Sequence, residues 1–266
     1  GDTWVASVPP GSELETAAAI AIDSRIKYAE PNYIYRATDI PDDPRFSELW
    51  GLNNTGQTGG TPDADIDAPE AWDVTTGSSS IVVAVIDTGV NYLHEDLAAN
   101  MWVNPDEIPA NGIDDDGNGY IDDIYGIDTA NDDSDPMDDD SHGSHVAGTV
   151  GAVGNNSLGV TGIAQNVSIM ALKFLGLDGG TAADAITAFQ YIIDMKQRGV
   201  NIKITQNSWG SQSLNQALLD VMNEAGALGI LHFAAAGNSG VDNDVTPHYP
   251  SSFDSPYVIA VAASDH

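Results

Sequence analysis

Three short segments carry side chains that could do acid–base and anion-binding chemistry. Asp87 ends an apolar run and is followed by Thr-Gly, His142 opens the segment His-Gly-Ser-His-Val-Ala-Gly, and Asn238 follows Ala-Ala-Gly. An imidazole can take a proton from a hydroxyl, and a side-chain amide can donate to a developing oxyanion. Taken singly, Asp87 is also typical of a helix cap and Asn238 of a turn at a strand end, so each residue alone is a weak signal.

The elements that would position these residues follow an alternating pattern. Short apolar runs that read as buried parallel strands lie at Ile81–Ile86, Val167–Leu172, Ile202–Thr205, Ile230–Ala236 and Tyr257–Ala263. Helical stretches lie between them at His142–Val153, Ala182–Arg198 and Leu214–Ala227. Alternating strands and helices predict an α/β fold, with an open, mostly parallel sheet between two helix layers. In such a sheet, functional groups collect at the carboxyl ends of the strands.

The three segments together, in this order along the chain, resemble the subtilisin-like serine proteases (subtilases, the peptidase S8 family). The resemblance covers essentially the whole chain. It implies that Asp87 orients the imidazole, that His142 acts as general base and then general acid, and that Asn238 binds the oxyanion. It also implies a set of residues that line the primary specificity pocket and pair with extended polypeptide substrate, namely Ser208, Trp209, Gly210, Ala235, Ala236 and Gly237. The small Gly and Ala walls of this pocket predict broad cleavage after medium or large apolar side chains.

One family motif is absent. The nucleophile of subtilases sits in Gly-Thr-Ser-Met-Ala at a helix start, and no such segment occurs here. We therefore expect the serine to lie beyond residue 266, and residues 1–266 alone to be inactive, with a removed carboxy-terminal segment or a second copy as a further partner. The alternative is a noncatalytic calcium-binding or peptide-binding module that has lost the serine. A third possibility is a metal-dependent hydrolase with His142 and His145 as ligands, although we expect His145 to be a packed structural residue.

The first residues have a pattern of their own. Trp4–Val8 and Ile26–Tyr28 read as short strands, with a helix over Ser12–Ser24 between them and more strand at 33–35. The segment Tyr28-Ala-Glu-Pro-Asn-Tyr33 resembles the final strand of the inhibitory propeptide of subtilases. We therefore predict a small, partial α+β propeptide unit over 1–37, autoprocessing near 36–39, and a C-terminally incomplete subtilisin-like catalytic domain over 38–266.

The charge is strongly acidic and unevenly placed. The net charge is −32, and between Arg45 and Lys173 there are 23 acidic residues and no Lys or Arg. This balance excludes nucleic acid as a partner. It indicates a highly soluble, salt-adapted surface, bound cations, or both. Cysteine is absent and no apolar run approaches the roughly 18 residues of a membrane span. The chain therefore fits a secreted protein that calcium stabilises in place of disulfides.

Two calcium sites are expected, with further weak sites open. The first is the loop Asp114-Asp-Asp-Gly-Asn-Gly-Tyr-Ile-Asp122, which has oxygen donors at loop positions 1, 3, 5 and 9. Position 12 is Tyr125, so an EF-hand is disfavoured, and Asp123 or water would complete the shell. The predicted ligands are Asp114, Asp116, Asn118, Tyr120 and Asp122. The family resemblance implies a second site made by Asp43, Asp96, Asn156 and the carbonyls of Val153, Leu158 and Val160. The run Asp132–Asp140 reads as a solvated loop.

Overall fold

The computed structural model describes residues 3–32 and 40–265. The chain divides into two compact units, Gly1–Thr38 and Asp39–His266. In the first unit, helix α1 spans Glu13–Ala21 with Ser12 at its N-cap, so the predicted helix is present but shorter than expected.

The strands predicted in the first unit are wrong for its described residues. Trp4–Val8 and Ile26–Tyr28 are irregular, and the first described segment is highly exposed, with Trp4 at 85%. Alternation of apolar residues yields a strand only where another strand accepts its backbone hydrogen bonds, and the described residues of this unit supply none. The predicted strand at 33–35 and the whole of the predicted processing segment at 36–39 lie outside the described residues.

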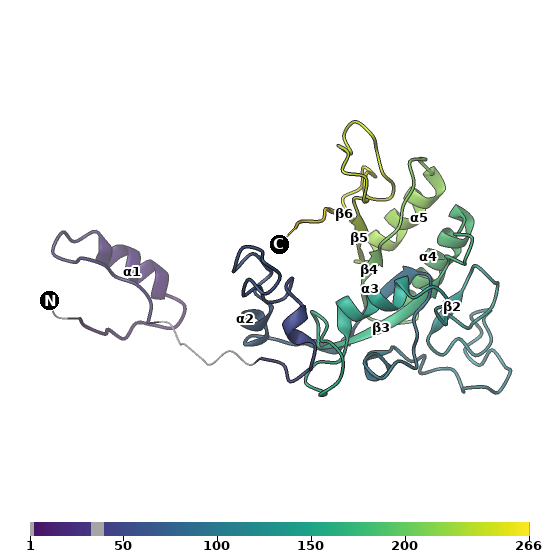
Figure 1. The fold of residues 1–266 in the computed structure, drawn as a ribbon, viewed down its shortest axis with the longest axis horizontal. Helices are drawn as coiled ribbons and strands as arrows, with labels where there is room; N and C mark the ends of the chain where they lie inside the picture. Colours follow the sequence, from purple (N-terminus) through teal and green to yellow (C-terminus); the bar gives the residue numbers. More distant parts are fainter. Residues whose placement is uncertain (1–2, 33–39, 266) are drawn as a thin grey trace. The chain divides into compact units, whose positions relative to one another are not determined.

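The second unit is built on one six-stranded sheet in the order β2-β3-β1-β4-β5-β6 (Figure 1). Every neighbouring pair of strands is parallel. The strands are β1 Gly77–Asp87, β2 Gly126–Asp128, β3 Asn166–Lys173, β4 Ile202–Asn207, β5 Leu231–Ala235 and β6 Val258–Val261. The predicted open, parallel α/β sheet is confirmed, and the short β2 is an addition.

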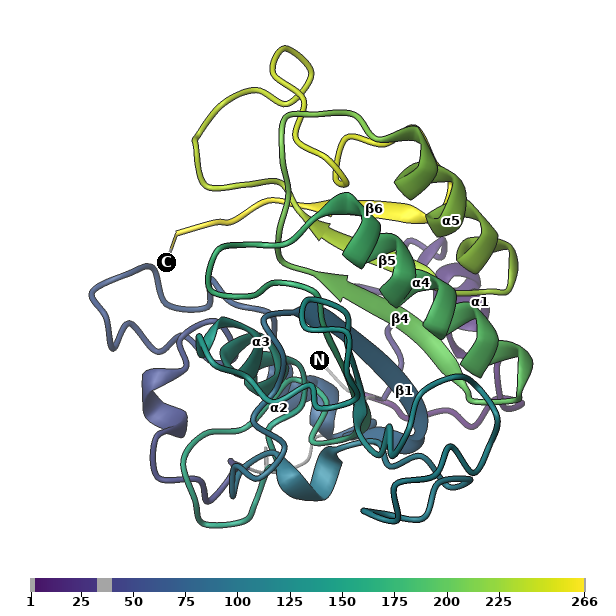
Figure 2. The same cartoon turned by 90° about the vertical axis from the view of Figure 1, so that its right-hand side faces the viewer.

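Helices cover both faces of this sheet. The long helices are α3 His142–Gly151, α4 Ala182–Gln197 and α5 Gln216–Ala227, and the short elements are η1 Phe46–Glu48, α2 Ala68–Trp72 and η2 Ala98–Asn100. Figure 2 shows α4 and α5 lying side by side across one face. Helix α4 starts with a capping box, in which Thr181 and Asp184 satisfy each other's backbone N–H groups.

Alternate residues of β1 enter two separate cores. Val82, Ala84 and Ile86 pack with the side chains of α4 and α5. Val83 and Val85 point to the opposite face and pack in a core that contains Ala147 of α3. This period of two is the signature of a strand buried on both sides, and it produces the three predicted layers.

The carboxyl ends of the central strands bring polar groups to one edge of the sheet. Asp87 ends β1 and pairs in register with Lys173 at the end of β3. Asn207 ends β4 and pairs with Ala234 of β5, so the segments that follow both strands leave the sheet at the same edge. None of the helices in the described part of the chain is long and apolar enough to cross a membrane.

Candidate active site and cation-binding loops

Asp87 and His142 form a short hydrogen-bonded pair. Nδ1 of His142 lies 2.6 Å from Oδ1 of Asp87, which also accepts the backbone N–H of Thr88 at 2.8 Å. When Asp87 is ionised its carboxylate can only accept hydrogen bonds, so the neutral tautomer that fits this contact has its proton on Nδ1 and its lone pair on Nε2. The pair therefore presents a nitrogen that can accept a proton.

The two partners differ sharply in exposure. The side chain of Asp87 is fully buried, whereas that of His142 is 49% exposed. Burial raises the pKa of the Asp87 carboxyl, and the hydrogen bond from His142 opposes that rise. The second oxygen of Asp87 is buried and has no hydrogen-bond partner among the described residues. The imidazole is thus held from the interior side and open to solvent on the other.

The first turn of α3 is fastened to the end of β1. The backbone N–H of Gly143 donates to Oγ1 of Thr88 at 2.8 Å. A side chain at position 143 is excluded, because a Cβ there would lie 2.1 Å from the carbonyl oxygen of Gly89. The Gly next to His142 therefore allows the helix start to approach the strand end closely.

Asn238 and the predicted substrate-binding residues follow the neighbouring strands. Asn238 is exposed in the segment after β5 and makes no hydrogen bond to Asp87 or His142. Ser208 accepts a hydrogen bond from Gln206 at 3.0 Å, and Trp209 packs edge-on against Phe174. The residues of this set that follow β5 are Ala235, Ala236 and Gly237, of which Ala235 ends the strand. The sheet therefore places both segments at the carboxyl edge, and their described side chains make no hydrogen bond to the pair.

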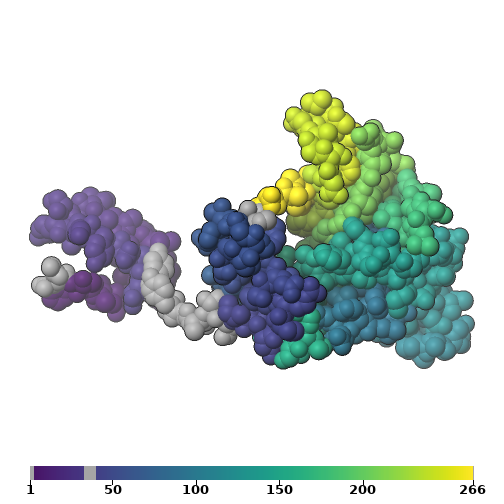
Figure 3. Space-filling model, in the orientation of Figure 1, coloured from purple at the N-terminus to yellow at the C-terminus, as the bar shows by residue number. Residues whose placement is uncertain are grey.

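His248 was missed by the sequence analysis. Its imidazole lies between two of the predicted pocket residues, because a Cβ at Gly210 would be 2.2 Å from Cε1 of His248 and one at Gly237 would be 3.3 Å from its Cδ2. His248, Gly237 and Asn238 are among the residues that line a cavity of about 390 Å³. Figure 3 shows the segment that carries them as the yellow-green lobe that projects from the second unit. No sequence motif marks His248.

His145 is exposed on α3, so the expectation that it is a packed structural residue is wrong. His142 and His145 share a helix face, yet neither belongs to a group of three metal-ligating side chains within the described residues. The only such group there consists of Glu107, Asp114 and Asp116. The structure therefore gives the histidine-metal hydrolase no support.

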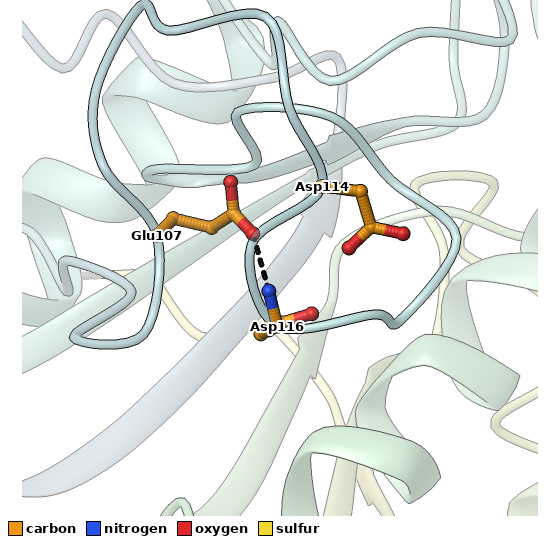
Figure 4. A group of neighbouring side chains, drawn as sticks. All are labelled: Glu107, Asp114 and Asp116. Atoms are coloured by element: carbon orange, nitrogen blue, oxygen red, sulfur yellow. Dashed lines mark hydrogen bonds between the residues drawn. The ribbon is translucent and has the colours of Figure 1, made fainter.

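The acidic loop gathers carboxylates around one point. One ligand atom from each of Glu107, Asp114 and Asp116 lies within 4.8 Å of the others, and Figure 4 shows the three side chains on facing stretches of the loop. Glu107 is 6% exposed, and its Oε1 accepts the backbone N–H of Asp115 at 2.8 Å and of Asp116 at 3.1 Å. A set made only of oxygen donors suits calcium. Glu107 lies outside the predicted motif, which is why the sequence did not reveal it.

The remaining predicted ligands of this loop are arranged differently. Asn118 donates its amide to Asp116 and Asp123, and its Oδ1 accepts the backbone N–H of Tyr120. Asp122 accepts two backbone N–H groups of the preceding turn, from residues 111 and 112, and it is not part of the carboxylate group.

Asp123 is the buried anchor beneath this loop. It is 0% exposed, and its Oδ2 accepts the hydroxyl of Tyr191 from α4 at 2.5 Å. Burial raises the pKa of Asp123 to about 6, against the lowering effect of the hydrogen bonds from Tyr191 and Asn118. The contact fixes the loop to the helix layer of the second unit.

The residues predicted for the second calcium site lie near one another and are joined by hydrogen bonds. Asp43 and Asp96 are 4% and 3% exposed and lie against the loop 153–160. Asp43 accepts the backbone N–H of Asn156 at 3.2 Å, and Asp96 accepts its side-chain amide at 2.8 Å and the N–H of Val160 at 2.8 Å. The N–H of Leu158 donates to Oδ1 of Asn156 at 2.8 Å. The N–H of Val153 donates to the carbonyl of Asp96 at 2.9 Å.

Comparison with known proteins agrees with this architecture. The profile of the Subtilase family (Peptidase S8) matches residues 78–266. The chain belongs to the subtilase family. It is 34% identical over 242 residues to the Thermophilic serine proteinase of Bacillus sp. (strain AK1), a match that covers 90% of this chain and 50% of that protein. It is 32% identical over 266 residues to an Extracellular protease of Xanthomonas campestris pv. campestris, covering 95% of this chain and 44% of that protein.

Solved structures of subtilases are also similar. Proteases from Pseudoalteromonas arctica PAMC 21717 match with a TM-score of 0.63 and 30% identity, over 86% of this chain and 66% of that one. Sphericase matches with a TM-score of 0.57 and 31% identity, over 70% of this chain and 54% of that one. This subtilase chain thus spans about half the length of the curated relatives it matches.

Proposed function

We propose that this subtilase chain is part of a secreted, calcium-stabilised serine endopeptidase that is made as a zymogen. The nucleophile is a serine outside residues 1–266, because the Gly-Thr-Ser-Met-Ala motif is absent from the sequence. The observation that carries the proposal is the 2.6 Å contact between His142 Nδ1 and the fully buried Asp87 carboxylate. A buried carboxylate that fixes a half-exposed imidazole is the arrangement in which the histidine of a Ser-His-Asp triad acts as general base.

The proposed roles are those that the resemblance to subtilases implies, and the geometry of the pair supports those of Asp87 and His142. Asp87 holds the ring orientation and stabilises the imidazolium that forms when His142 takes the serine proton. His142 then returns that proton to the leaving amine. Asn238, exposed after β5, donates its amide to the oxyanion of the tetrahedral intermediate. The segments Ser208–Gly210 and Ala235–Gly237 bind extended polypeptide substrate.

Calcium is the proposed stabilising ion at the two loops. One ion would be held by Glu107, Asp114 and Asp116. Asn118 and the carbonyl of Tyr120 would be further oxygen donors, and Asp122 would lie outside the group of direct ligands. Asp43, Asp96, Asn156 and the carbonyls of the 153–160 loop would hold the other. Calcium would supply the positive charge that the region between Arg45 and Lys173 lacks, and it would stabilise the fold through differential binding to the native state.

The first unit is proposed to be the carboxy-terminal part of an inhibitory propeptide. One support is that Gly1–Thr38 is a compact unit with its own internal contacts. The other is that the segment beginning at Tyr28 resembles the final strand of the inhibitory propeptide of subtilases. Secretion is supported by the Xanthomonas relative, which is named an Extracellular protease.

The deciding experiment compares the complete protein with its histidine variants. The complete protein should hydrolyse casein and react with a fluorophosphonate probe, and His142→Ala should lose both properties. His145→Ala is the matched control, because it removes an exposed histidine from the same helix. Residues 1–266 alone should remain unlabelled. A complete protein that neither cleaves nor labels would favour the noncatalytic module, and strong labelling of residues 1–266 would show that the nucleophile lies inside them.

A further inference from the structure

The loop that precedes α3 has a carboxylate at the centre of five hydrogen bonds. Oδ1 of Asp138 accepts the hydroxyl of Thr88 at 2.9 Å and the backbone N–H groups of Asp140 and Ser141 at 3.0 Å each. Oδ2 accepts the backbone N–H and the hydroxyl of Ser144, at 2.9 and 2.5 Å. These hydrogen bonds lower the pKa of Asp138, although its partial burial acts in the opposite direction. Asp138 therefore stays ionised and acts only as an acceptor.

The side-chain donors to Asp138 come from the two segments that carry Asp87 and His142. Thr88 directly follows Asp87 in the sequence, and Ser144 lies in the first turn of the helix that His142 begins. The same Thr88 hydroxyl accepts the N–H of Gly143 at 2.8 Å. The first N–H groups of a helix have no partner inside the helix, so Thr88 and Asp138 together fix where α3 starts.

A buried lysine holds the loop from beneath. The side chain of Lys173 is 4% exposed, and Nζ lies 3.0 Å from Oδ2 of Asp139 and 3.6 Å from Oδ2 of Asp128. It also donates to the carbonyl of Met137 at 3.2 Å. Burial by itself lowers the pKa of Lys173, but the two carboxylates raise it overall, so the lysine is charged. It contacts the loop residues immediately before and after Asp138.

Close backbone packing adds a third constraint. The carbonyl of Pro136 accepts the N–H of Val90 at 2.9 Å. A Cβ at Gly89 would lie 2.5 Å from that same oxygen and 3.0 Å from the backbone nitrogen of Asp138. Gly89 also has a φ of +101°, which L side chains rarely adopt. The loop can therefore sit against the end of β1 only because residue 89 lacks a side chain.

We propose that Asp138 is a positioning residue for the Asp87–His142 pair, and that Lys173 fixes the loop that carries it. The hydrogen bonds of Asp138 go to Thr88, Asp140, Ser141 and Ser144, and none goes to the imidazole of His142. It sets the distance between the end of β1 and the start of α3, and therefore the Nδ1–Oδ1 contact on which the proposed function rests. Asparagine cannot replace it, because the NH2 of an amide is a donor and would stand where a carboxylate oxygen now accepts hydrogen bonds. Oδ1 accepts three of them and Oδ2 accepts two.

The test uses Asp138→Asn with Asp140→Asn as its matched control. Asp140 is an exposed neighbour on the same loop, and its carboxylate makes no hydrogen bond to the described residues. The first readout is the proton NMR signal of His142 Nδ1–H, which a short hydrogen bond to Asp87 moves far downfield. We expect this signal in the wild type and in Asp140→Asn, and its loss or upfield movement in Asp138→Asn.

The second readout is peptide hydrolysis by the complete protein, at a temperature where circular dichroism shows every variant folded. Asp138→Asn should lower kcat by about tenfold to about 100-fold, the range expected when a catalytic group is misplaced, with KM within about twofold of wild type. Lys173→Met should lower kcat in the same direction, and Lys203→Met, at an exposed lysine on β4, should not. Equal loss of kcat in the two Asn variants, or none in either, would overturn the proposal.

Variants of Thr88 test the same proposal if Asp138→Asn does not fold. Thr88→Val removes the hydroxyl that links Asp138 to Gly143 at nearly constant volume, whereas Thr88→Ser retains it. The valine variant should lose the downfield signal and the serine variant should keep it, and an unchanged signal in the folded valine variant would count against the proposal. The NMR readout needs no peptidase activity, so a displaced signal in an inert complete protein would refute the proposed function and leave the positioning role standing.

Discussion

The side-chain amide of Asn156 donates to Oδ1 of Asp96 at 2.8 Å, across a sequence separation of 60 residues. Asp96 is 3% exposed, and its other oxygen is held by the N–H of Val160 at 2.8 Å. Without a cation, this buried carboxylate is compensated only by neutral donors. The calcium ion proposed for this site would compensate the charge directly, and the stability of the 153–160 loop would then depend on calcium.

Asp96→Asn should therefore reduce the effect of calcium on unfolding. For one site, calcium at a hundredfold excess over its Kd stabilises the native state by about 2.7 kcal/mol. The variant should lose that contribution, measured as the difference in melting temperature with calcium and with EGTA. Glu95→Gln is the control, because it neutralises an exposed carboxylate next in sequence. An identical calcium response in Asp96→Asn and wild type would contradict the assignment.

The protection of the acidic loop by calcium should depend on Glu107. Glu107→Gln removes a charge from the carboxylate group and weakens an acceptor of three backbone N–H groups. We expect chelation to expose the wild-type loop to chymotrypsin after Tyr120, and the variant to be cleaved there even with calcium. Asp106→Asn changes the exposed neighbour and should behave as wild type. Protection of the Glu107→Gln loop at all calcium concentrations would count against a cation at this position.

His232 should make the fold sensitive to acid. The ring is fully buried between Thr205 Oγ1 and the carbonyl of Met222, at 2.8 Å each, and burial lowers its pKa to about 4 from 6.5. The unfolded chain therefore binds the proton first, so the stabilisation is complete above pH 6.5 and is lost as pH falls towards 4. The shift corresponds to about 3 kcal/mol.

The measurement is the free energy of unfolding by urea at pH 7 and pH 4.5. The loss between these pH values should be smaller in His232→Asn than in wild type, although the variant is less stable at both. His145→Asn, at an exposed histidine, should retain the wild-type loss. Comparing variants removes the contribution of Asp123, whose raised pKa of about 6 acts with the opposite sign. Parallel pH curves for His232→Asn and wild type would refute the prediction.

His248 should limit the side chain that the complete protein accepts before the cleaved bond. Its ring fills space between Gly210 and Gly237, so His248→Ala should enlarge the pocket. We expect kcat/KM for a phenylalanine substrate, relative to an alanine substrate, to rise by about tenfold, since one extra methylene can change selectivity by that much. Val245→Ala, at a 78% exposed residue of the same segment, is the control. An unchanged ratio would place His248 outside the substrate pocket.

The parallel sheet could be predicted because its signal is local. Strands such as Ile81–Ile86 are continuous apolar runs, and burial on both faces requires that composition. β2 could not, because a strand of three residues has no measurable period. The same local reasoning failed at Trp4–Val8, where alternation exists but no described residue of the first unit offers a partner strand.

Only those residues of the candidate site that stand in recognisable motifs could be predicted from the sequence. Asp87 and His142 stand in recognisable segments, and the structure joins them by a hydrogen bond. Glu107 lies seven residues before the acidic motif, Lys173 pairs with its loop through tertiary contacts, and His248 approaches its glycines only after the chain has turned back. Such contacts between distant segments leave no spacing signal in the sequence.

The burial of Lys173 also decides how the molecule can be cut. Proteases of tryptic specificity need an accessible lysine or arginine, and from residue 46 to residue 172 the chain contains neither. The lysine that ends this stretch has a side chain only 4% exposed. Both candidate cation loops and the Asp87–His142 pair therefore lie in one tract that trypsin cannot open in the folded protein. After denaturation, a tryptic digest would release the tract as a single peptide from Phe46 to Lys173.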